Sequence, residues 1–311
     1  MAEAGSRYIT HKQAVGLKRS TLQDYESYLR VHLAPFFGER PLDSIDLELV
    51  EEFIAAKRQQ GKATKSAINY VLLLSAIFGH AIRRGWCTRN PVRDVEKPRD
   101  DRSRDIRFLS GAELEALLAA VRQTTLGRSD RVLYLAAAMT GMRRGELLAL
   151  RWQDIDWQSL QIRVRRNYTR GEFGTPKSRR STRTVPLAPR LVSELKDHLE
   201  RSRFSEAIDL VFCNPASGAV RDGSHIRRRF IATAGRAGLR PVRFHDLRHT
   251  FGTQMAAAGA PMRAVQEWMG HSNYQTTSIY ADYALDPARG AHYATLAFPP
   301  PTEPADSTPA A

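Results

Sequence analysis

Apolar residues follow a helical spacing over most of this chain and a strand spacing in one stretch. In residues 114–121 they recur three and four positions apart, and residues 132–139 form an almost wholly apolar run typical of a buried helix. In residues 160–164 they alternate with polar residues instead, and residues 182–187 alternate in the same way. The sequence therefore predicts a mainly α-helical protein with one small antiparallel β-sheet.

The helical stretches fall into two groups, separated by a charged segment. Residues 92–108 contain Pro98 and lack apolar periodicity, which is typical of a linker. Helix starts are expected where side chains can cap, and helix stops where glycine follows the last periodic residue. The expected starts are Ser20 (with Gln23), Asp46, Thr64 and Ser110 (with Glu113), and the expected stops are Gly61 and Gly85. We predict an N-terminal arm or truncated remnant (1–18), a helical module (19–97), a linker (98–108), a second domain (109–296) and a disordered, Pro-rich tail (297–311).

The charge of the chain favours a polyanionic partner. Its 311 residues include 47 Lys and Arg against 33 Asp and Glu, a formal charge of +14. Basic side chains gain by displacing counterions from phosphates, so nucleic acid is the expected partner. A ribosome-associated protein or a merely basic enzyme would have the same charge.

Cysteine use and hydropathy bear on where the chain works. Cys87 and Cys213 lie far apart and suggest neither a disulfide framework nor a zinc site, which suits a reducing cytoplasm. The N-terminus has no apolar signal region. No run approaches the ~18 apolar residues of a membrane span, so we expect no membrane partner. The expected location is cytoplasmic, in association with the nucleoid.

Chemistry-bearing residues cluster in short motifs. The stretch TGMRRGE supplies an arginine and a glutamate, TPKS a lysine, HDLRH a histidine and an arginine, and HSNYQTTSIY a histidine followed nine positions later by a tyrosine. These residues are Arg143, Glu146, Lys177, His245, Arg248, His271 and Tyr280.

In this order the motifs resemble those of the tyrosine recombinases, also called phage-type integrases. The resemblance covers roughly residues 109–290 and extends to the helical region before them. It implies an N-terminal helical core-binding (SAM-like) domain that clasps DNA, followed by a C-terminal tyrosine-recombinase catalytic domain. It assigns the phosphate-activating set as Arg143, Lys177, His245, Arg248 and His271, and the nucleophile as Tyr280.

The residue types suit metal-free cleavage of a phosphodiester, which needs a nucleophile, cations, a proton acceptor and a proton donor. Arg143 and Arg248 can make bidentate contacts with phosphate oxygens. Glu146, one helical turn after Arg143, could orient it or simply form a helix salt bridge. His245 and Arg248 share one helix face, whereas His249 is expected to be structural or supporting.

Two of these assignments have close rivals. Lys177 has arginine neighbours, but a lysine can give up its proton to a leaving oxygen whereas an arginine effectively cannot. Tyr280 competes with Tyr274 and Tyr283, and helical geometry does not separate Tyr280 from Tyr283. The family pattern favours Tyr280, because it begins a Tyr-Ala pair at the expected distance from the histidine.

The resemblance implies a site-specific recombinase that exchanges strands of double-stranded DNA through a 3′-phosphotyrosyl intermediate. It also implies a homotetramer on two DNA sites. Accessory DNA-bending or directionality proteins would be further partners. We expect no cofactor and no catalytic metal. The alternatives are a type IB topoisomerase-like enzyme and a DNA-binding regulator with a vestigial site. Residues 1–18 are too few for the arm-binding domain of many phage integrases, so we expect an Xer-like architecture or a truncated form.

Overall fold

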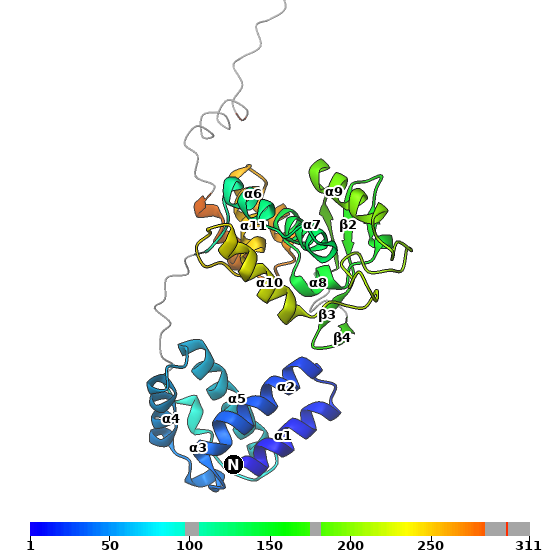
Figure 1. The fold of residues 1–311 in the computed structure, drawn as a ribbon. Helices are drawn as coiled ribbons and strands as arrows, with labels where there is room; N and C mark the ends of the chain where they lie inside the picture. The colour runs from blue at the N-terminus through cyan, green and yellow to red at the C-terminus, as the bar shows by residue number, and fades with distance from the viewer. Residues whose placement is uncertain (97–105, 175–181, 284–296, 298–311) are drawn as a thin grey trace, which may run out of the picture. The chain divides into compact units, whose positions relative to one another are not determined.

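A computed structural model describes residues 1–96, 106–174, 182–283 and 297 (Figure 1). The chain divides into two compact units, Met1–Arg104 and Asp105–Ala311. Each unit has a hydrophobic core of its own, and each is described by itself below.

The first unit is wholly helical in its described part. Its elements are α1 (Ala2–Ala14), α2 (Arg19–Tyr28), the π-helical turn η1 (Leu29–Leu33), α3 (Ala34–Phe37), η2 (Leu42–Ser44), α4 (Leu47–Gln59), α5 (Thr64–Arg83) and η3 (Pro91–Arg93). Helix α2 runs through η1 into α3 without a break. Pro35 lacks an N–H and its ring crowds the carbonyl four residues earlier, which accounts for the wider turn at that point.

Helix α1 corrects the prediction that residues 1–18 form a separate arm. It packs against α2 and α5, and it buries Tyr8 and Ile9 in the core of the unit. The Tyr8 ring lies edge-on to the ring of His80, with centroids 5.6 Å apart. The sequence pattern was too weak to show this, because few apolar residues lie on the helix and most of its surface is polar.

The helix boundaries agree in part with the capping patterns. Asp46 caps α4 by accepting a hydrogen bond from the Leu49 amide at 2.9 Å, as predicted. The predictions at Ser20 and Thr64 were wrong, because α2 and α5 begin after Lys18 and Ala63 without a side-chain cap. A buried helix face can specify a helix start without a capping side chain, since packing stabilises the first turn.

Helix α5 is the central element of the first unit. It buries one whole face, including Leu74, Ile77 and Phe78. Its length and composition would also suit a membrane span, and half of its apolar window is buried inside the unit. The same composition is typical of a core helix, which is the position that α5 occupies here.

The second unit combines helices with a small sheet. Its helical elements are α6 (Gly111–Ala119), α7 (Thr125–Thr140), α8 (Arg144–Leu148), η4 (Trp152–Asp154), α9 (Pro189–Glu200), α10 (Gly223–Arg236), α11 (Asp246–Ala257), α12 (Met262–Met269), α13 (Gln275–Ser278) and η6 (Ala281–Tyr283). Its strands are β1 (Ile155–Asp156), β2 (Gln161–Val164), β3 (Asn167–Thr169), β4 (Glu172–Gly174) and β5 (Arg183–Pro186). The core forms around α7, which contacts α6, α8, α9 and α11.

The sheet follows the predicted pattern. Strands β1, β2 and β5 pair antiparallel in that order, with Ile162 opposite Val185. Both residues are buried. On β2 the polar residues that alternate with the buried ones, Gln161 and Arg163, are exposed. A second hairpin, β3–β4, was not predicted, because its strands are short and largely exposed. The mainly helical fold with a small antiparallel sheet is confirmed.

The predicted linker, 98–108, lies mostly outside the described residues, but its last residues belong to the second unit. Arg107 donates a hydrogen bond to the Pro241 carbonyl at 2.9 Å, and the Phe108 carbonyl accepts one from Arg240. Ser110 and Glu113 then form the predicted capping box at the start of α6. The predicted tail lies outside the described residues except for residue 297.

We expect Tyr8→Ala to destabilise the first unit by about 3 kcal/mol, because it removes a large buried ring. Hydrogen–deuterium exchange of the α5 amides, followed by mass spectrometry, measures this in the full chain. The control Val15→Ala, at a residue 59% exposed, should leave exchange unchanged. Equal exchange in the Tyr8 variant and the wild type would show that α1 is not part of the core.

Candidate active site

Arg143 stands at the junction of α7 and α8. Helix α7 ends at Gly141, whose φ of 61° lies in the left-handed region and whose missing side chain leaves room for the Phe251 ring. Arg143 then caps α8: its amide donates to Glu146 Oε2 at 2.8 Å, and its Nη1 donates to Oε1 at 3.0 Å. The pairing expected between these residues is therefore present, as a helix cap and an ion pair together.

Glu146 is almost fully buried and pairs with a second arginine, Arg183, which is one of the arginine neighbours of Lys177 in the sequence. Arg183, at the start of β5, donates from Nη1 and Nη2 to the two carboxylate oxygens at 3.1 and 2.9 Å. Burial raises the pKa of Glu146, but the hydrogen bonds and charges of Arg183 and Arg143 outweigh it and leave that pKa below its ordinary value. The carboxylate is thus held ionised in the interior.

Arg248 lies deeper in the same cluster. It is buried on the first turn of α11, and its guanidinium donates to the Gly141 carbonyl and to the Met269 carbonyl. Burial, together with the positive charge of Arg143, lowers its pKa to about 9. The group therefore remains charged at neutral pH.

These three arginines converge on the C-terminal end of α12. Arg183 Nε donates to the Trp268 carbonyl at 2.5 Å, Arg248 Nη2 to Met269 at 2.5 Å, and Arg143 Nη2 to Gly270 at 3.2 Å. The last carbonyls of a helix lack partners within it and carry a partial negative charge. The end of α12 therefore brings together arginines from three different elements.

His271 follows this helix end directly. Gly270 adopts the left-handed conformation that ends α12. The Nδ1 atom of His271 lies 2.9 Å from the Thr277 hydroxyl. Burial, and then the charges of Arg248, Arg143 and Arg183, lower the pKa of His271 to about 3, so the ring is neutral at neutral pH.

Tyr280 lies in a small core formed by α11, α12 and the segment after α13. Only 1% of its surface is exposed, and its ring is nearly parallel to that of His271, with centroids 6.5 Å apart. Its hydroxyl lies 2.9 Å from Nδ1 of His249. Burial raises the pKa of Tyr280 to about 12, although the charge of Arg248 acts in the opposite direction.

The rival tyrosines have different surroundings. Tyr274 is 49% exposed and Tyr283 is 39% exposed. The Tyr283 ring packs edge-on against Phe108, with centroids 5.1 Å apart. Of the three, Tyr280 is the one buried among the arginines and histidines of the cluster.

His245 stands at the edge of the cluster, at the position before α11. It is exposed, and it lines a hollow of about 920 Å³ together with Arg143 and the β3–β4 hairpin. Packing around the ring and the nearby His249 and Arg248 lower the pKa of His245 below its ordinary value. Lys177 lies outside the described residues.

His249 is the residue whose position differs from the sequence-based expectation. It was expected to point away from the site, yet its ring contacts the hydroxyl of Tyr280. A signal was present in the sequence, since His249 and Gly252 are one helical turn apart and form one face of α11. What that face would contact could not be known without the tertiary structure.

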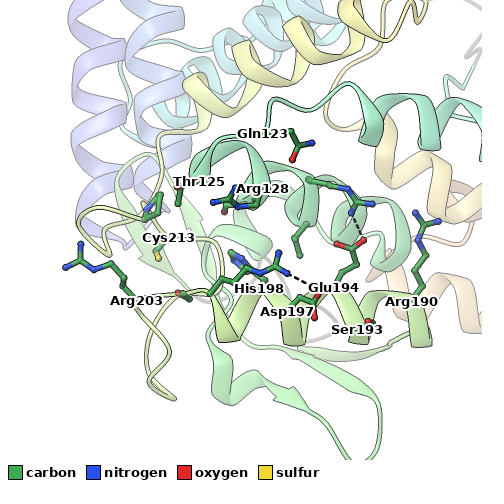
Figure 2. A pocket seen from close by; sticks show the side chains of 16 residues that line it. Gln123, Thr125, Arg128, Arg190, Ser193, Glu194, Asp197, His198, Arg203 and Cys213 are labelled. Atoms are coloured by element: carbon green, nitrogen blue, oxygen red, sulfur yellow. Dashed lines mark hydrogen bonds and ion pairs between the residues drawn. The ribbon is translucent and has the colours of Figure 1, made fainter.

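The described residues of the cluster carry more positive than negative charge. Two guanidinium groups, those of Arg143 and Arg183, pair with one buried carboxylate, and a third, that of Arg248, donates to the same helix end without a carboxylate partner among the described residues. Such an excess favours an anion, and planar guanidinium groups suit the oxygens of a phosphate. A separate hollow of about 770 Å³ lies beside α7 and α9 (Figure 2), where Arg131 pairs with Glu194, and none of the predicted site residues lines it.

Comparison with known proteins identifies the family. Residues 107–285 match the model of the phage integrase family, and residues 2–98 match that of the phage integrase central domain. The chain belongs to the phage integrase family. This integrase is thus a tyrosine-type site-specific recombinase, an enzyme that cuts and rejoins DNA, as the motifs predicted.

Two relatives are similar to this integrase over most of its length. The integrase is 28% identical over 294 residues to a tyrosine recombinase XerC-like protein of Caldanaerobacter subterraneus subsp. tengcongensis, covering 85% of this chain and 74% of the relative. It is 28% identical over 276 residues to tyrosine recombinase XerD of Listeria innocua, covering 85% and 88%.

Two solved structures share the fold. The Tn1549 transposon integrase in complex with a circular intermediate DNA matches with a TM-score of 0.80 at 21% identity, covering 94% of this integrase and 98% of that chain. A lambda integrase dimer bound to a COC′ core site matches with a TM-score of 0.71 at 20% identity, covering 91% and 95%.

We expect Arg183→Gln to destabilise the second unit of the integrase by about 3 kcal/mol, because it removes one partner of a buried ion pair and leaves the Trp268 carbonyl unpaired. Urea unfolding followed by circular dichroism measures the change. Arg163→Gln on β2 removes an exposed pair with Asp156 and should have little effect. Similar unfolding curves for both variants would contradict a structural role for Arg183.

Proposed function

We propose that this integrase recombines double-stranded DNA at specific sites, with Tyr280 as the nucleophile and a 3′-phosphotyrosyl intermediate. The observation that supports it best is the convergence of three arginines on the end of α12, next to a buried tyrosine. In this proposal the excess positive charge holds the phosphate that Tyr280 attacks.

Each described residue then has a chemical role. Arg143 and Arg248 bind the non-bridging oxygens of the scissile phosphate and stabilise the charge that builds up on them during attack. Glu146 and Arg183 keep these groups in position through their hydrogen bonds to Arg143 and to the end of α12. His271 is held by Thr277 at Nδ1, so Nε2 is the nitrogen that would face a phosphate oxygen. His245, at the open edge, supports the same phosphate.

The nucleophile must change its surroundings during the reaction. The Tyr280 hydroxyl is buried and its raised pKa keeps it neutral in the absence of DNA. Attack requires the segment around Tyr280 to present its oxygen to the phosphate, and the oxygen must lose its proton. The phosphotyrosyl bond keeps the energy of the broken phosphodiester, so the strand can be rejoined to a new partner without ATP.

Assembly on DNA follows from the same reaction. Exchange of strands between two sites needs four active sites, and we propose a homotetramer on two DNA duplexes. Support comes from a structural neighbour, the lambda integrase, described as a tetramer bound to a Holliday junction. The first unit, which matches the central domain of phage integrases, would clasp the DNA with its basic side chains. The segment that we expect to contact a neighbouring subunit, 281–298, lies outside the described residues except for 281–283 and 297.

Tyr280→Phe should abolish the covalent adduct and leave DNA binding unchanged, because it removes one oxygen and keeps the ring. Adducts trapped on genomic fragments first give the target sequence, and a nicked suicide duplex of that sequence then measures adduct formation. Tyr274→Phe and Tyr283→Phe are the matched controls and should still form adduct. Adduct formation by Tyr280→Phe but not by Tyr283→Phe would move the nucleophile three residues along the chain.

Lys177 should protonate the departing 5′-oxygen. Lys177→Ala should therefore fail on normal DNA and recover on a duplex whose leaving oxygen is replaced by sulfur, because a thiol is a much stronger acid than an alcohol and leaves without a proton. Cleavage of both duplexes by the variant is measured under single-turnover conditions. Equal failure on the two would show that Lys177 binds phosphate or that another residue supplies the proton.

A further inference from the structure

The β3–β4 hairpin lies against helix α8 (Figure 1). Its strands pair antiparallel, with Asn167 opposite Gly174. The loop between them is Arg170 and Gly171, whose φ values of 53° and 87° are both positive, as in the tight two-residue turns that match the twist of a hairpin. The Tyr168 side chain packs against the core of the second unit. The hairpin therefore has a defined turn at one end and an anchored base at the other.

Gly145, in the first turn of α8, is the point where the helix and the hairpin come closest. A Cβ placed on Gly145 would overlap the side-chain oxygen of Asn167 and would lie 2.5 Å from the carbonyl oxygen of Tyr168. The carbonyl belongs to the backbone of β3, and the Asn167 amide donates to the Thr169 hydroxyl at 2.7 Å. A side chain on residue 145 would therefore displace the hairpin itself.

The helix alone does not call for a glycine at this position. Gly145 does not have a positive φ, so its backbone conformation suits any residue. Alanine favours a helix more than glycine does, by about 1 kcal/mol. The close approach of β3, and not the conformation of α8, is thus what the missing side chain permits.

The hairpin leads to Lys177, which lies outside the described residues. Lys177 follows Gly174, the last residue of β4, by three positions. An extended chain spans at most about 3.6 Å per residue, so the Lys177 backbone stays within roughly 11 Å of the end of β4. On the other side of the contact, Gly145 is two residues after Arg143. The contact at Gly145 therefore connects the segment of the proposed acid with the helix that begins at a proposed phosphate ligand.

We propose that Gly145 is a positioning residue: its close contact with β3 sets the distance between Lys177 and the phosphate that Arg143 binds. The inference rests on the proposed function, in which the Lys177 ammonium gives its proton to the 5′-oxygen as the bond from phosphorus to that oxygen breaks. Proton transfer needs donor and acceptor about 2.6–3.2 Å apart, so a small displacement of the hairpin takes the acid out of reach.

A different role for Gly145 would concern α8 alone. An added methyl group could disturb Arg143, which in the proposed function binds the non-bridging oxygens of the phosphate, and cleavage would weaken without any change at Lys177. The leaving atom separates the two roles. Sulfur in place of the 5′-oxygen leaves without a proton, whereas the non-bridging oxygens are the same in both duplexes.

Gly145→Ala should form the covalent adduct about 10- to 100-fold more slowly than the wild type on the normal duplex, and at a near wild-type rate on the sulfur duplex. Single-turnover adduct formation on the two nicked duplexes measures both rates. Gly111→Ala is the matched control, because Gly111 lies in the first turn of α6 and a Cβ there meets nothing within 4 Å. Arg143→Ala provides the reference for a phosphate-binding defect, which sulfur does not correct.

The effects of Gly145→Ala and Lys177→Ala should not multiply. The acid is already absent from Lys177→Ala, so adding Gly145→Ala should slow the normal duplex by no more than about twofold further. Two losses that multiply would show that Gly145 acts through another group and would overturn the proposal.

Asn167→Ala tests the same contact from the hairpin side without adding volume, and it decides the question if circular dichroism shows that Gly145→Ala does not fold. It should show a smaller loss that is again restricted to the normal duplex. Equal slowing on the two duplexes, in whichever of these variants folds, would overturn the proposal, and so would wild-type rates on both.

The two levels of the argument fail in different ways. If Lys177→Ala recovers on sulfur and Gly145→Ala does not, the proposed function stands and the positioning role of Gly145 is wrong. If Lys177→Ala fails equally on both duplexes, Lys177 is not the acid, and the inference about Gly145 falls with that part of the proposed function.

Discussion

The C-terminal end of α12 is the point on which the site depends. Three successive carbonyls, from Trp268 to Gly270, accept hydrogen bonds from arginines on β5, α11 and the α7–α8 junction. Carbonyls at a helix end carry partial negative charge and lack partners of their own, so they can hold cations that would otherwise repel each other. His271 comes next in the chain and is therefore placed beside the three arginines, with its Nδ1 atom held by the Thr277 hydroxyl.

The charge balance of this cluster bears on its stability and on the kind of ligand that it favours. Burying guanidinium groups is costly unless they are paired, and Glu146 with the α12 carbonyls offsets part of that cost. The pairing is incomplete among the described residues, because one carboxylate pairs with two arginines and Arg248 has only carbonyl partners. The excess of positive charge suits a phosphate of DNA, the proposed substrate.

The proposed nucleophile lies beside this positive charge and yet remains protonated. Tyr280 packs in the small core between α11 and α12, where burial keeps its hydroxyl protonated despite the nearby Arg248. The histidine that contacts it is neutral for the same reason, since burial lowers the pKa of His249. Burial thus keeps both the hydroxyl and the imidazole that it contacts uncharged.

The sequence by itself determined the family, the helical fold with its small sheet, and the short-range geometry of the site. Arg143 and Glu146, or His245 and Arg248, are three residues apart, and helical spacing alone predicts that such pairs lie together. The tertiary structure decided the contacts between residues far apart in the sequence, which local spacing does not predict. The pairing of Arg183 with Glu146 joins β5 to α8, and the contact of His249 with Tyr280 joins α11 to a segment about thirty residues later. Helix α1 also joined its core only through packing, because its few apolar residues gain their stability from the partners they meet and not from their own pattern.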